Sequence, residues 1–152
     1  MKLILCIAFT TLVGFASGMA NVNAINSWYT QIQKPSFNPP NYLFGPVWTV
    51  LYILMGVSLY LIIQAPSNDA KKTAYWIFGI QLLLNALWSF IFFYFHQIGF
   101  AFIEIAILWI MIIAMIWVFY GINKTAALIQ IPYLLWVTFA SVLNFAIWRL
   151  NS

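Results

Sequence analysis

The side chains best suited to bind a ligand are the tryptophans, tyrosines and amides that interrupt long apolar segments of the chain. Between residues 73 and 95 such side chains share one helical face, and they are Gln81, Asn85, Trp88, Ser89 and Phe92. Between residues 126 and 148 a second face of this kind holds Gln130, Tyr133, Val137, Ser141 and Asn144. In the segment 46–64, Trp48, Tyr52 and Met55 share a side.

Two functions fit these faces. Polar groups that join membrane helices contribute about 0.6 kcal/mol per hydrogen bond on average. The same groups could instead line a cavity, with aromatic walls and amide and hydroxyl groups for the polar edge of a ligand. The chain has 8 tryptophans and 20% aromatic residues, more than helix joining requires. Both interpretations stay open at this point.

Residues for hydrolytic or metal-dependent catalysis do not form a recognisable set. Glu104 is the carboxylate deepest in an apolar segment, which makes it a functional candidate by default. We nevertheless expect a structural role for it, as a neutral group hydrogen-bonded across the bundle. His96 is expected to be a solvated turn residue, and Cys6 a packed, inert thiol. No metal site and no required cofactor are predicted.

The elements that position these residues are membrane-spanning helices. The chain is 65% hydrophobic and 5% charged, with a mean hydropathy of +0.97, whereas a soluble domain has about 25% charged residues. A spanning helix needs roughly 20 apolar residues. The sequence therefore predicts an all-α membrane protein, a five-transmembrane-helix bundle in one domain, residues 1–152, with helices at about 3–21, 46–64, 73–95, 100–120 and 126–148.

The first segment could also be a cleaved signal peptide, since small residues follow its apolar run. Its length and the spacing Gly14-x-x-x-Gly18, which lets two helix backbones approach closely, favour a retained helix. Four of the six cations (Lys2, Lys71, Lys72 and Lys124) then lie on the side of the N-terminus, and Lys34 and Arg149 lie opposite. This bias predicts a cytoplasmic N-terminus.

One connection, residues 22–45, is long, and we expect it to be a lid over the bundle. Three prolines stiffen it, and its aromatic side chains would cover an apolar surface or anchor at the lipid headgroups. In the last helix, Pro132 predicts a kink.

Four segments in order resemble the TspO/MBR family, the tryptophan-rich sensory proteins related to the mitochondrial translocator protein, or peripheral benzodiazepine receptor. The most specific is W-Y-T-Q-I-Q-K-P-S-F-N-P-P at 28–40, followed by F-G-P-V-W-T-V-L-Y at 44–52. The other two are Q-L-L-L-N-A-L-W-S-F-I-F-F at 81–93 and I-P-Y-L-L-W-V-T-F-A-S-V-L-N at 131–144. The resemblance covers nearly the whole chain.

The resemblance implies a dimeric five-helix bundle that binds porphyrins such as protoporphyrin IX, or haem, in a pocket under the first loop. By motif the pocket residues would be Tyr29, Pro39, Trp48, Asn85, Trp136 and Ala140. The helical faces described above add Tyr52, Trp88, Tyr133, Ser141 and Asn144 as ligand-binding candidates. Lys34 in the loop is a candidate partner for a porphyrin carboxylate.

The resemblance also leaves open light- and oxygen-dependent degradation of protoporphyrin IX, with Trp48 and Trp136 as the catalytic candidates, or transport of hydrophobic small molecules. The cholesterol motif of the mitochondrial relatives needs a cation within about five residues of a tyrosine. Here the first cation after Tyr133 is Arg149. We therefore expect a protein of the bacterial cytoplasmic membrane.

Overall fold

The computed structural model describes residues 1–152 and is helical throughout, with no strand. Five stretches are long and apolar enough to cross a membrane, which confirms the predicted fold class. The elements are α1 (Lys2–Ile25), α2 (Trp28–Gln31), η1 (Asn41–Leu43), α3 (Phe44–Gln64), α4 (Ala70–Ser89), η2 (Phe90–Tyr94), α5 (Ile98–Ile122), α6 (Lys124–Leu128) and α7 (Ile131–Leu150).

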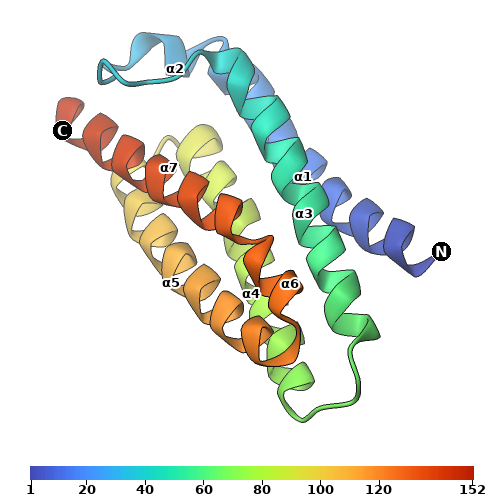
Figure 1. Ribbon diagram of the computed structural model, residues 1–152. Helices are drawn as coiled ribbons and strands as arrows, with labels where there is room; N and C mark the ends of the chain where they lie inside the picture. Colours follow the sequence, from blue (N-terminus) through green and yellow to red (C-terminus); the bar gives the residue numbers. More distant parts are fainter.

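Two groups of helices make up the bundle. Helix α1 lies along α3, while α5 packs between α4 and α7 (Figure 1). The segment 26–40, called the first loop below, crosses one end of the bundle, where the C-terminal end of α7 also lies (Figure 1). The first loop thus covers one end of the bundle.

Side chains satisfy carbonyl and amide groups that the helix ends leave unpaired. Lys71, in the first turn of α4, donates from Nζ to the carbonyl oxygens of Ile63 (3.1 Å) and Ala65 (2.8 Å). At the start of α6 the Oδ1 atom of Asn123 accepts from the backbone N–H of Ala126 at 3.0 Å. These contacts close two of the tight turns between spans.

Helix boundaries differ from the predicted ones in two places. Helix α1 runs to Ile25, so the first loop is shorter than predicted and contains the single turn α2. The last span is broken into α6 and α7 at residues 129–130, and Pro132 lies in the first turn of α7. The predicted kink at Pro132 is therefore wrong in position: the proline starts a helix, where its missing N–H costs no hydrogen bond.

The C-terminal end of the third span is a π-helical turn, η2. The backbone N–H of Phe95 donates to the carbonyl oxygen of Phe90 at 2.9 Å, a five-residue spacing. Two consecutive side chains of this turn, Phe92 and Phe93, are buried. Turns of this type are frequent near functional sites.

Helices α1 and α3 touch closely at one end only. A Cβ atom added at Gly56 would lie 2.5 Å from Cα of Ile7, and one at Gly14 would lie 2.3 Å from the Tyr52 ring. Thr10 Oγ1 donates to the carbonyl oxygen of Tyr52 at 2.7 Å. At Gly18, one turn further along α1, an added Cβ would meet nothing within 4 Å. The two helices therefore separate towards the first loop.

Candidate functional site

A chain of hydrogen bonds crosses the centre of the bundle. The hydroxyl of Tyr52 donates to Oδ1 of Asn85, and Nδ2 of Asn85 donates to the hydroxyl of Tyr133 at 2.9 Å. That hydroxyl in turn donates to Oε1 of Gln81 at 2.9 Å. All four residues are buried. These hydrogen bonds join α3, α4 and α7. At the centre of the bundle, the polar face of α4 therefore holds helices together.

A second polar junction lies nearer the first loop. The indole N–H of Trp88 donates to Oδ1 of Asn144 at 3.0 Å, and Nδ2 of Asn144 donates to the carbonyl oxygen of Ile98 at 3.0 Å. This junction joins α4, α7 and the start of α5. Ser141, one turn before Asn144, donates to its own helix at the carbonyl oxygen of Val137.

Glu104 does not make the predicted hydrogen bond across the bundle. Its side chain is buried in α5, and neither carboxyl oxygen has a hydrogen-bond partner in the protein. The predicted hydrogen bond is therefore wrong: Tyr133 and Asn85, the polar groups at the centre of the bundle, bond to one another and not to Glu104.

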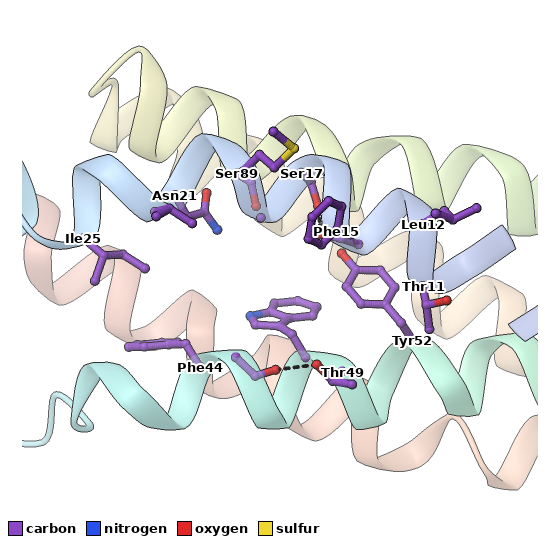
Figure 2. Close-up of a pocket in the computed structure, with 16 residues that line it drawn as sticks. Thr11, Leu12, Phe15, Ser17, Asn21, Ile25, Phe44, Thr49, Tyr52 and Ser89 are labelled. Atoms are coloured by element: carbon purple, nitrogen blue, oxygen red, sulfur yellow. Dashed lines mark hydrogen bonds between the residues drawn. The ribbon is translucent and has the colours of Figure 1, made fainter. Parts of the chain in front are cut away.

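A cavity of about 590 Å³ lies where α1 and α3 separate (Figure 2). We call it the α1–α3 cavity. Trp48 and Tyr52 of α3 form one wall, Gly18 and Asn21 belong to the other, and Ser89 of α4 lies at the back. No charged side chain lines it. Ligand pockets of proteins commonly measure about 300–1,000 Å³, so this cavity has room for a ligand of many rings.

A much smaller cavity, about 20 Å³, lies on the other side of Trp48. Trp48 and Trp136 both line it, with Tyr29 of the first loop, and we call it the inner cavity. A space of this size holds about one water molecule. The two tryptophans are thus brought together under the first loop as the sequence predicts, but without space for a porphyrin between them.

Two buried polar atoms near these cavities have no partner in the protein. They are Oδ1 of Asn21, in the α1–α3 cavity wall, and the indole N–H of Trp136, in the wall of the inner cavity. Buried polar groups are nearly always hydrogen-bonded, and an exception calls for an explanation.

The first loop is fixed by its own polar groups. Tyr29 is 2% exposed, and its hydroxyl donates to Oδ1 of Asn38 at 2.7 Å. Burial raises the pKa of Tyr29 to about 12, so the hydroxyl keeps its proton at neutral pH. Lys34 Nζ donates to the carbonyl oxygens of Tyr29 (2.6 Å) and Ile32 (3.0 Å). The Lys34 ammonium therefore stabilises the loop, and two of its three protons are already used.

The predicted site residues fall into three groups. Two line the α1–α3 cavity: Trp48 and Tyr52. Six line the inner cavity: Tyr29, Trp48, Trp88, Trp136, Ala140 and Asn144. Five line neither cavity: Lys34, Pro39, Asn85, Tyr133 and Ser141. Of these predicted residues, Trp48 alone lines both cavities. Phe44 of α3 lines both as well, so these two side chains separate the cavities.

Sequence reasoning missed the wall that α1 contributes. Thr11, Gly14, Gly18 and Asn21 lie at offsets of 0, 3, 7 and 10, which is one helical face of small and polar residues. In the sequence, the spacing of Gly14 and Gly18 predicts a helix-contact motif. Only Gly14 makes such a contact, with the Tyr52 ring, while Gly18 faces the cavity.

Comparison with known proteins gives a consistent result. The profile of the TspO/MBR family matches residues 6–149. The tryptophan-rich protein TspO of Chlorobaculum tepidum is 40% identical over 152 residues, which covers 99% of this chain and 96% of that protein. The tryptophan-rich sensory protein of Cereibacter sphaeroides is 31% identical over 94% of this chain and 90% of its own length. The human translocator protein is 35% identical over 82% of this chain and 75% of its own.

Proposed function

Since the chain belongs to the TspO/MBR family of membrane proteins, we propose that it binds a porphyrin-type tetrapyrrole in the α1–α3 cavity and acts as a sensor or regulator. The observation that carries the proposal is the cavity of about 590 Å³ walled by Trp48 and Tyr52. A flat aromatic macrocycle can stack on such rings. The word "sensory" in the name of the Cereibacter relative supports the regulatory part.

The partners of the ligand are aromatic faces and neutral polar groups. Trp48 and Tyr52 have ring centroids 5.8 Å apart and planes inclined by 32°. The Tyr52 ring is buried against Gly14, so Trp48 has the more accessible aromatic face. The unpaired Oδ1 of Asn21 is available to a ligand donor. No metal ligand from the protein is required, and free porphyrin or haem would be held by the same surfaces.

Filling the cavity from α1 should weaken binding. We expect Gly18→Leu to weaken protoporphyrin IX binding by at least about tenfold, a loss of roughly 1.4 kcal/mol, because the new side chain would occupy space in the cavity. Titration of the purified protein, followed by the Soret absorbance of the porphyrin, measures the effect.

The matched control is Gly79→Leu. Gly79 lies on an exposed face of α4, and a Cβ there also meets nothing within 4 Å. The control should bind as the unchanged protein does. Equal affinity of the two variants would place the ligand outside the α1–α3 cavity.

A second candidate function is light- and oxygen-dependent degradation of protoporphyrin IX. Its support is the position of Trp48, an oxidisable indole in the cavity wall whose ring centroid lies 6.4 Å from that of Tyr133. Trp136 would be the second electron donor. Illumination of the loaded protein with and without oxygen, compared with free porphyrin treated in the same way, separates the two functions, since only a degrading protein would convert the porphyrin faster than light and oxygen do alone. Transport of porphyrins is a third candidate, supported by the word "translocator" in the name of the human relative.

The proposal includes a homodimer in a bacterial cytoplasmic membrane, with the N-terminus in the cytoplasm. The orientation follows from the lysines near the N-terminus and at the starts of α4 and α6. A reporter fused after Ser152 should therefore be active on the non-cytoplasmic side, where the first loop would also lie. A reporter that is active in the cytoplasm would show that the orientation is the opposite of the proposed one.

A further inference from the structure

The α1–α3 cavity is open on the side of α1 that faces outward from the bundle. Four of its lining residues have large exposed side chains, between 61% and 69% of the full surface: Leu12, Phe15, Met19 and Val22. We call them the α1 rim; Figure 2 shows Leu12 and Phe15 on α1 along the cavity. Because α1 is long and apolar enough to cross a membrane, we expect these side chains to face lipid. Acyl chains would then border the cavity directly.

The first loop, which covers the end of the bundle, is held in place by polar and aromatic contacts. Asn151, just after α7, holds the loop with two reciprocal bonds: the backbone N–H of Gln33 donates to its Oδ1 at 2.9 Å, and its Nδ2 donates to the carbonyl oxygen of Gln33 at 2.8 Å. Trp28 stacks on His96 with ring centroids 4.3 Å apart. Opening the loop would break these contacts together with those of buried Tyr29.

The gap between α1 and α3 is not fastened in this way. The close contacts between the two helices, Thr10 with Tyr52 and Gly56 with Ile7, lie at the far end of the pair. Towards the first loop α1 packs instead on α4 and η2, and an added Cβ at Gly18 meets nothing within 4 Å. Widening the gap along the rim therefore breaks no hydrogen bond between α1 and α3. A ligand that enters between α1 and α3 therefore has fewer hydrogen bonds to break than one that enters under the first loop.

The chemistry of the lining fits an approach from lipid. The polar groups of the cavity wall are hydroxyls and one amide, with no charged side chain. A carboxylate buried there would lack a cation, which is costly. A ligand that comes from the bilayer can insert its apolar part first and keep its charged edge at the membrane surface.

We propose that the ligand reaches the α1–α3 cavity from the bilayer, between α1 and α3, and that the first loop is a fixed cover. The proposal rests on the proposed porphyrin site. The class of ligand it selects is a flat molecule that partitions into the membrane before it binds.

The test compares two obstructions in full-length protein reconstituted in lipid nanodiscs, with Cys6→Ser as the background. Gln33→Cys with Asn151→Cys would tie the loop to α7 through a disulfide, verified by mass and reversed by reductant. Met19→Trp places a bulky side chain at the rim, and Ile110→Trp is its matched control on the exposed face of α5. The association rate of protoporphyrin IX is measured from its own fluorescence.

Met19→Trp should slow association by about tenfold, while the oxidised loop disulfide and Ile110→Trp should leave the rate within about twofold. A tenfold slower rate in the oxidised disulfide variant, restored by reductant, would mean that the ligand passes under the loop. A rate unaffected by Met19→Trp would also overturn the proposal.

Asn151→Ala gives an independent result if the disulfide does not form. It frees the loop, so faster association in this variant would contradict a fixed cover, and an unchanged rate supports it. A protein that binds no porphyrin at equilibrium would instead overturn the proposed function, which the titration shows separately.

Discussion

Replacement of Trp48 by leucine is expected to weaken protoporphyrin IX binding by about tenfold to a hundredfold. Loss of one aromatic stacking partner costs roughly 1–3 kcal/mol in complexes with nucleic-acid bases, and a macrocycle on an indole should fall in this range. Trp48 lines both cavities, and its ring centroid lies 5.8 Å from that of Tyr52. No other tryptophan lines the α1–α3 cavity.

Trp136→Leu is the informative comparison. Trp136 lines only the inner cavity, so its replacement should weaken binding less than Trp48→Leu does. Equal losses would mean that the ligand lies between the two tryptophans, in an inner cavity that expands when it binds. Trp117→Leu, on the lipid side of α5 with 82% of its surface exposed, controls for general effects on the protein. A Trp48→Leu protein that folds and binds with unchanged affinity would place the site elsewhere.

Gly56→Val should be the most destabilising single substitution on α3. Its Cβ would lie 2.5 Å from Cα and 2.8 Å from N of Ile7, and backbone atoms of a packed helix cannot rotate away as a side chain can. Overpacking of this kind typically costs about 1–3 kcal/mol, and we expect the upper part of that range. Thermal unfolding in detergent, followed by circular dichroism, should show a clearly lowered midpoint.

The control for this variant is Gly79→Val, where the added atoms enter open space on α4. Both variants carry the same small penalty for a β-branched residue in a helix, so the difference between them isolates the contact of α1 with α3. Equal midpoints for the two variants would show that α1 is not held against α3 at this position.

Much of the fold could be predicted because membrane helices follow from hydrophobic length alone. The polar faces of the third and fifth spans also pointed inward as expected: Gln81, Asn85, Tyr133 and Asn144 are all buried. What the spacing could not decide was their partners. Asn85 pairs with Tyr52 and Tyr133, so an amide that was predicted to bind a ligand is used to join helices.

The large cavity could not be predicted because it depends on an angle between two helices. Gly14 and Gly18 look equivalent in the sequence, yet one packs against Tyr52 and the other borders empty space. The difference arises from the contact of Gly56 with Ile7, which fixes where α1 and α3 meet. Residues far apart in the chain thus decide which glycine lines the site.

The π-helical turn has a consequence for changes in chain length. A π turn holds one residue more than an α turn, so deletion of one residue within 90–94 could be absorbed locally by a return to regular helix. If the deleted residue were Phe92 or Phe93, both of which are buried, the wall of the inner cavity would lose one aromatic side chain. In genetic terms, this turn is a place where a one-codon deletion would reshape the lining of a cavity while the helices on either side keep their length.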